Sequence, residues 1–182
     1  YHSDKYSYPE YHIEKTKECD ELGIKLIHIF EDEWKLNKEV VKSRLLNMLG
    51  KTTTKIHARN TTVKELTAKQ AKEFLIDNHI QGNCLSAIKL GLFLEDELVS
   101  VMTFGSLRKN LGQKSEEGHY ELLRFCNKIN TNVVGGASKL LSHFNKNYNP
   151  LQIISYADRR WSDGGLYEKL NFTFDKYTDI NY

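Results

Sequence analysis

Two short segments near the carboxyl end of the chain constrain its fold most strongly. In residues 134–141 a Gly-Gly turn opens a helix with an apolar face, and residues 165–172 hold a short helix that carries Tyr-Glu-Lys. A run of β-forming residues lies between them. Backbone amides at a helix start can hold a phosphate, and a tyrosine on the next helix can supply a proton. Each segment also has a simpler explanation, a turn that only starts a helix and a core tyrosine with its hydroxyl paired.

The composition is that of an ordinary globular chain. Of its 182 residues, 40% are hydrophobic and 27% are charged, which argues against disorder and allows one domain or one domain with a piece of another. The formal net charge is only +2, so any surface for nucleic acid must be local. Cys19, Cys84 and Cys126 follow no metal-ligand spacing, which predicts reduced thiols in an intracellular protein. No apolar run approaches the length of a membrane span.

The start of the chain is predicted to be a separate unit. Residues 8–22 are helical in composition, residues 24–30 favour a short strand, and residues 31–49 show a helical apolar period. A polar break at residues 51–54 is the predicted linker. We therefore expect two domains, at residues 1–50 and 55–182.

Helix and strand patterns alternate in the second unit. Thr67 is placed to cap a helix at residues 68–78, and Glu95-Asp96 is the predicted turn of a hairpin at residues 85–104. A strand, a helix, a strand, a helix and a strand follow at residues 120–126, 134–145, 153–157, 164–170 and 172–177. This order indicates an α/β or α+β domain with three layers.

Both glycine-led segments resemble signatures of the acyl-CoA-dependent N-acetyltransferase-like (GNAT) fold. Asn132-Val133-Val134-Gly135-Gly136-Ala137 resembles its pyrophosphate loop, Gln/Arg-x-x-Gly-x-Gly/Ala, with Asn132 at the first position. Tyr167-Glu168-Lys169-Leu170-Asn171-Phe172 resembles Tyr-Glu-Lys-x-Gly-Phe, with Asn171 in place of Gly. The resemblance implies that Tyr167 protonates the departing thiolate of the cofactor. It also implies acetyl-CoA binding by Val134, Gly135, Gly136, Ala137 and Ser138.

Two further stretches narrow the resemblance to the Mom branch of these proteins. They are Asn78-His79-Ile80-Gln81-Gly82 and Tyr156-Ala157-Asp158-Arg159-Arg160. Mom proteins are phage enzymes that modify adenine in DNA. The resemblance implies site positions at His79, as a general base or substrate contact, and at Asp158 and Tyr167. The alternatives are a helix-end histidine and an Asp–Arg pair that closes a loop.

Residues 1–49 resemble something else, the carboxyl half of the very-short-patch-repair endonuclease fold, which is restriction-endonuclease-like. The run Lys25-Leu26-Ile27-His28-Ile29-Phe30-Glu31-Asp32-Glu33-Trp34 is similar to that of phage homing endonucleases that join this core to a Mom-like tail. The resemblance implies a nuclease that uses Mg²⁺, with His2 as its site histidine and with its metal-binding acids outside this chain. We therefore expect no metal ligands here and take the acids at 31–33 as solvated helix-start residues. The first residue, Tyr1, predicts a fragment or a processed chain.

Basic side chains supply the predicted contacts with double-stranded DNA. Lys35, Lys38, Lys42 and Arg44 lie on the predicted second helix, Arg108 and Lys109 in a polar loop, and Arg159, Arg160 and Trp161 after the strand at 153–157. Arginine and lysine bind phosphates, and tryptophan can stack on a base. A solvated helix face is the alternative for the first group.

The leading functional prediction is a DNA-acting phage protein. It would be part of a site-specific homing endonuclease that hydrolyses phosphodiesters, with a Mom-like DNA-binding tail, and it would act in the cytoplasm of the host cell without a membrane partner. One alternative is an acyl-CoA-dependent transferase that modifies adenine in DNA. Another is a DNA-binding module without catalysis.

Overall fold

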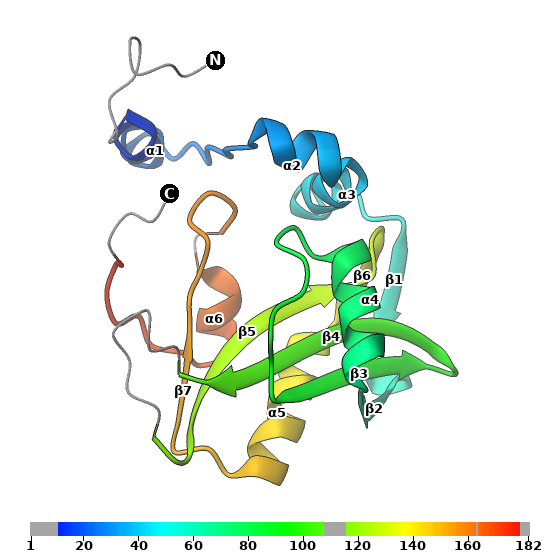
Figure 1. Cartoon of the computed structure of the whole chain (residues 1–182). Helices are drawn as coiled ribbons and strands as arrows, with labels where there is room; N and C mark the ends of the chain where they lie inside the picture. Colours follow the sequence, from blue (N-terminus) through cyan, green and yellow to red (C-terminus); the bar gives the residue numbers. More distant parts are fainter. Residues whose placement is uncertain (1–10, 108–115, 163, 179–182) are drawn as a thin grey trace.

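A five-stranded sheet forms the centre of the computed structural model, which describes residues 11–107, 116–162 and 164–178. The strand order is β2-β3-β4-β5-β7 (Figure 1). The strands are β2 Thr62–Glu65, β3 Ile88–Leu94, β4 Glu97–Ser106, β5 His119–Asn127 and β7 Gln152–Ser155. Neighbours are antiparallel except β5 and β7, which run parallel. The predicted hairpin is confirmed as β3 and β4, and Glu95 takes a left-handed φ of 54° in its turn.

Helix α4, Ala68–Asn78, covers one face of the sheet. Thr67 caps it as the sequence predicts: the Thr67 hydroxyl accepts from the Gln70 backbone N–H at 3.2 Å, and the Gln70 side chain accepts from the Thr67 N–H at 3.0 Å. Its buried Phe74 and Leu75 pack with residues of β3 and β4. This apolar contact, and not helix propensity alone, holds α4 in place.

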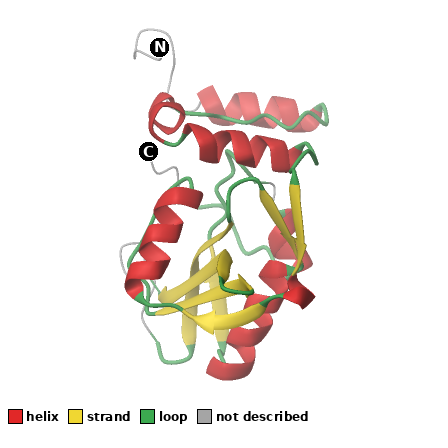
Figure 2. Cartoon of the chain, turned by 90° about the vertical axis from the view of Figure 1, so that its right-hand side faces the viewer, coloured by secondary structure: helices red, strands yellow, loops and turns green. Residues whose placement is uncertain are grey.

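Helices α5, Gly136–Tyr148, and α6, Gly165–Lys169, lie on the opposite face. The Phe144 ring of α5 stacks on Phe104 of β4, with ring centroids 3.7 Å apart. Leu170 and Phe172, which follow α6, pack against the same cluster of buried residues. Figure 2 shows the resulting three layers, with the sheet between helices on its two sides. The predicted three-layer α/β architecture is therefore confirmed.

A small second sheet leads into α5. Strand β1, Thr54–His57, pairs in parallel with β6, Thr131–Val134, and a 3-10 turn, η1 at Ala58–Asn60, follows β1. The first residue of β1 is thus the last residue of the predicted linker.

Three helices lie across one end of the sheet domain (Figures 1 and 2). They are α1 Tyr11–Glu21, α2 Glu31–Leu36 and α3 Lys38–Met48. Val40 and Val41 of α3 form a buried cluster with Ile80 and Trp161 of the sheet domain. A hydrogen bond reinforces the junction: the Asn130 backbone N–H donates to the side-chain oxygen Ser43 Oγ at 2.7 Å. None of the helices in the described ranges is long and apolar enough to cross a membrane.

Three secondary-structure predictions are wrong. Residues 24–30 and 172–177 form no strand, because neither segment has a neighbouring strand to pair with in the described part of the chain. The helix predicted at residues 31–49 is broken at Asn37, whose φ of −125° and ψ of 32° are not helical. The break aims the Asn37 amide at the Ile80 carbonyl, 3.4 Å away.

Candidate functional site

The amino end of α5 has the geometry that the glycine pair predicts. Strand β6 ends at Val134, Gly135 takes a left-handed φ of 77°, and the helix begins at Gly136. The Lys139 N–H makes the first helical bond, to the Gly135 carbonyl at 3.0 Å. The amides before it have no acceptor within the helix, and the helix dipole favours an anion beside them. Val134, Gly135 and Ser138 are exposed there, whereas Gly136 and Ala137 are buried.

Gly135 and Gly136 meet different structural requirements. A Cβ on Gly136 would lie 3.1 Å from a Val133 methyl and 3.3 Å from a Leu92 methyl, so this glycine lets the helix approach the strands. A Cβ on Gly135 would meet only Ala58, at 3.7 Å. The exposed surface of the turn is therefore open at Gly135, and its amide end fits the phosphates of a nucleotide cofactor.

Tyr167 of α6 points its hydroxyl at the end of β7. The phenol oxygen lies 3.1 Å from Ser155 Oγ, which is also 3.1 Å from the Leu122 carbonyl. The single proton of the Ser155 hydroxyl cannot make both hydrogen bonds. When Ser155 donates it to the Leu122 carbonyl, the Tyr167 hydroxyl donates its own proton to Ser155 Oγ. Asn171, which stands in place of the glycine of the signature after α6, takes a left-handed φ of 62°. Tyr167 also packs edge-on against Phe172.

Asp158 lies where β7 leaves the sheet, as predicted. The parallel pairing ends at Leu122 and Ser155, while β5 continues to Asn127. The Asp158 carboxylate accepts from the Arg160 backbone N–H and Nε, both at 3.1 Å, and from Arg160 Nη2 at 2.7 Å. The arrangement is the loop-closing Asp–Arg pair. These three bonds from one residue hold the loop after β7 closed.

The prediction that Trp161 stacks on a base is wrong. Its side chain is only 3% exposed and packs against Val40, Val41 and Ile80. Arg160 is also committed, because its Nη1 binds Glu33 of α2 at 2.9 Å in addition to the bond to Asp158. Arg159 is exposed, with its guanidinium 4.3 Å from the Tyr177 ring.

His79 follows α4 and is set up as a hydrogen-bond donor. Its Nδ1 accepts from the Gln81 backbone N–H at 3.1 Å. Burial, and next the positive charges of Arg124 and Arg44, lower the pKa of His79 to about 3. The neutral ring with Nδ1 occupied carries its proton on Nε2. This arrangement favours the predicted role of substrate contact over that of general base.

Arg124 is a neighbour of His79 that the sequence analysis missed. Its Nε donates to the Gly82 carbonyl at 3.3 Å and its Nη1 to the Leu123 carbonyl at 2.9 Å. The sequence did hold a signal that could have identified Arg124, namely a charged residue within the apolar run of β5.

Of the remaining predicted DNA contacts, some contact neighbouring side chains and others lie outside the described residues. On the helices, Lys35 binds Glu31 at 2.5 Å, Lys42 binds Glu39 at 2.8 Å, and Lys38 lies 5.3 Å from the Trp34 ring. Exposed ion pairs of this kind are weak, so the phosphate contacts of these lysines stay predictions. The predicted residues His2, Arg108 and Lys109 lie outside the described residues.

Metal binding finds no support. Within the described ranges no three or more His, Cys, Asp or Glu side chains gather to hold an ion. Of the acids at the start of α2, Glu33 is not solvated as predicted: its side chain is 11% exposed and paired with Arg160.

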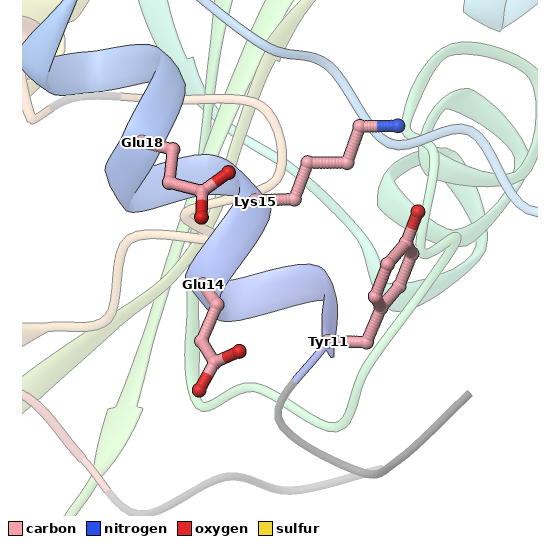
Figure 3. Close-up of a pocket in the computed structure, with 4 residues that line it drawn as sticks. All are labelled: Tyr11, Glu14, Lys15 and Glu18. Carbon is pink, nitrogen blue, oxygen red and sulfur yellow. The ribbon is translucent and has the colours of Figure 1, made fainter.

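Two surface hollows lie elsewhere. One, of about 190 Å³, is lined by Tyr11, Glu14, Lys15 and Glu18 of α1, and Figure 3 shows the carboxylates and the lysine spreading from the helix. The other, of about 400 Å³, lies beside α4 and includes Glu73, Asp77, Asp96 and Glu97. None of the site residues above lines the first hollow, and the second is too acidic to attract DNA.

Taken from α4 to α6, the order of elements is the one predicted for an acetyltransferase-like, three-layer α/β domain, with the short strand β6 added before α5 and without the last predicted strand. A glycine-led helix and a tyrosine-bearing helix share one face of its sheet. The chain belongs to the Mom protein family, which matches residues 60–181. The match leaves residues 1–59 aside, and the comparisons give no support to a nuclease part.

Solved structures give a partial likeness. A ribosomal-protein-alanine N-acetyltransferase from Brucella melitensis biovar Abortus 2308 is 17% identical, with a TM-score of 0.47 over 67% of this chain and 98% of that one. An aminoglycoside acetyltransferase from an uncultured soil metagenomic sample is 15% identical, with a TM-score of 0.49 over 68% and 95%. An integron cassette protein of V. cholerae is 8% identical, with a TM-score of 0.46 over 68% and 93%. No curated protein matches the chain.

Proposed function

We propose that the chain is an acyl-CoA-dependent transferase that modifies adenine in DNA. Membership of the Mom family supports the substrate class. The observation that carries the proposal is the open, glycine-led start of α5 on the same face of the sheet as Tyr167. In the proposal, one ligand spans this face and meets both the phosphate cradle and the proton donor.

The cofactor, when bound, supplies the acyl group as a thioester. The first-turn amides of α5, at residues 136–138, hold its pyrophosphate, and Gly135 leaves room for the phosphate oxygens. Tyr167 keeps a proton at its phenol oxygen, and Ser155 Oγ, 3.1 Å away, orients that hydroxyl. The proton is thereby held for the thiol that leaves.

His79 and Asp158 prepare the other half of the site. The His79 Nε2–H offers a neutral donor, and the ring nitrogens of adenine are acceptors of the matching kind. Asp158 positions the loop after β7 through Arg160. Neither role requires a charge on the base.

A single acidic side chain tests the phosphate cradle. Ser138 is exposed in the first turn of α5, where Glu would favour the helix dipole but repel phosphate. We expect Ser138→Glu to weaken acetyl-CoA binding about tenfold or more without lowering the melting temperature. Isothermal titration calorimetry and thermal unfolding measure both. Ser142→Glu, with the same change one turn later at an exposed position, is the matched control and keeps its affinity.

The obvious alternative variant is a poor test. Gly136→Glu would drive a side chain into Val133 and Leu92, so lost binding would report a damaged fold. Equal affinity of Ser138→Glu and the control would contradict the cradle.

The reaction itself is tested by mass. The protein is incubated with acetyl-CoA and unmodified duplex DNA. The DNA is then digested to nucleosides, and the masses of the deoxyadenosine products are measured by mass spectrometry. We expect a deoxyadenosine product heavier by the transferred group. Unchanged adenine across several acyl-CoA donors would contradict the proposal.

Assays of DNA cutting and DNA binding separate the competing functions. The homing-endonuclease function stays a prediction: the full-length parent should cut DNA when Mg²⁺ is added, whereas this chain alone should bind DNA without cutting it. A non-catalytic module would bind DNA with neither cutting nor modification, and its binding would weaken steeply with salt.

A further inference from the structure

Arg44 is a half-buried cation without a counter-ion. It extends from α3 into the junction with the sheet domain, where its guanidinium lies 4.9 Å from the Trp161 ring. It makes no hydrogen bond or ion pair with any residue that the structure describes. Burial lowers the pKa of Arg44, although the charge of Asp158 opposes this shift. Such a charge destabilises the fold unless something else compensates it.

The neighbouring carboxylates are already in use. Asp158 and Glu33 both bind Arg160 directly, so they act on Arg44 only from a distance. Their two negative charges face two guanidinium groups, those of Arg160 and Arg44, but only Arg160 is in direct contact with them.

Arg124 adds a second cation on the other side of the turn that begins at His79. Its Nε and Nη1 donate to the uncharged Gly82 and Leu123 carbonyls, and its Nη2 has no partner among the described residues. The charges of both arginines act on His79 and on Cys126. Contacts bring both arginines to the turn that begins at His79, because Trp161, the ring beneath Arg44, packs with Ile80, and Arg124 binds the Gly82 carbonyl.

Donors are also in excess there. The indole N–H of Trp161, the ring beneath Arg44, is buried and lacks a partner among the described residues. His79, with its proton on Nε2, begins the turn whose Gly82 carbonyl Arg124 binds. A region rich in N–H donors and poor in acceptors matches an anion with several oxygens, and a phosphate meets the planar fork of arginine well.

We propose that Arg44 and Arg124 bind a backbone phosphate of the DNA beside His79, so that α3 completes the substrate site. The inference rests on the proposed function, because it takes DNA as the substrate. It assigns a role to a helix that lies outside the part of the chain matched by the family. The phosphate supplies the missing counter-charge and places the adjoining nucleotide next to His79.

A substitution that keeps the length of the side chain but removes its charge separates binding from folding. We expect Arg44→Met to keep or raise the melting temperature, since it removes a buried charge, and to weaken binding of a short, labelled, adenine-containing duplex about tenfold at low salt. The slope of log affinity against log salt should fall by about one. Arg44→Lys, which keeps the charge without the fork, should bind between the two. Affinity for acetyl-CoA should stay unchanged in all of them.

Lys146→Met is the matched control. It removes one exposed charge from the last turn of α5, a position that is not among the predicted DNA contacts, so we expect less than a twofold loss of DNA affinity.

The outcomes distinguish this inference from the proposed function. A lower melting temperature for Arg44→Met together with unchanged DNA binding and salt slope would make Arg44 a packing residue and overturn the inference. Failure of the wild type to bind the duplex would overturn it as well. Weaker binding by Arg44→Met in a protein that transfers no acyl group would uphold the phosphate site and reject the transferase.

Discussion

Tyr167→Phe is expected to slow acyl transfer to DNA about 100-fold or more while leaving the affinities for acetyl-CoA and DNA unchanged. The reason is that the substitution removes one hydroxyl, the group proposed to hold a proton for the leaving thiol, and keeps the ring that packs against Phe172. The rate is measured at saturating concentrations of both substrates, so that a change in binding does not enter. Loss of an interaction made only in the transition state lowers kcat and kcat/KM together.

Tyr148→Phe supplies the control. Tyr148 also lies on a helix of this sheet face, and its hydroxyl bonds to Glu65. Removing that hydroxyl should leave the rate within about twofold of wild type. A full rate for Tyr167→Phe would identify Tyr167 as a core tyrosine whose hydroxyl is simply paired.

The second large effect concerns pH. The pKa of His79 is about 3 in the folded protein against 6.5 for an unperturbed histidine, so between these pH values the unfolded chain binds a proton at this side chain and the folded protein does not. Stability is therefore fully present above pH 6.5 and is lost as the pH falls toward 3. Between pH 7 and pH 4.5 the loss due to this histidine alone is about 2–3 kcal/mol.

His79→Asn isolates that contribution, since the Asn oxygen can still accept the Gln81 N–H that His79 Nδ1 accepts. Denaturant unfolding at a series of pH values should give curves that run parallel above pH 7 and diverge below it, with the variant losing less. Burial also lowers the pKa of His28, so both proteins keep some acid sensitivity. Equal losses down to pH 4.5 would contradict the assigned burial of His79.

Local signals explain most of the correct predictions of the fold. Thr67 and Gln70 lie within one helical turn, and the two runs of β-forming residues in β3 and β4 meet at a turn of two adjacent residues. The glycine at position 135 predicts a left-handed residue without reference to the rest of the chain. Each of these features depends on neighbours in sequence.

The errors come from contacts between distant residues. Trp161 and Arg160 stand in a basic, apparently exposed stretch, but α2 and α3 cover them through Glu33 and Val41, more than one hundred positions away in the chain. Residues 24–30 have the composition of a strand, yet composition does not supply a partner strand. The environment of Arg44 likewise depends on a helix, a strand and a loop that meet only in the fold.

The short parallel pair of β1 and β6 links two parts of the molecule mechanically. The turn between α3 and β1 is not slack, because the Lys51 N–H bonds to Leu46 at 2.8 Å and the Asn47 side chain bonds to Thr52 at 3.1 Å. A displacement of α3 is thus transmitted along β1 to its register with β6, which ends one residue before Gly135. The position of the amino-terminal helices and the geometry of the amino end of α5 therefore cannot change independently.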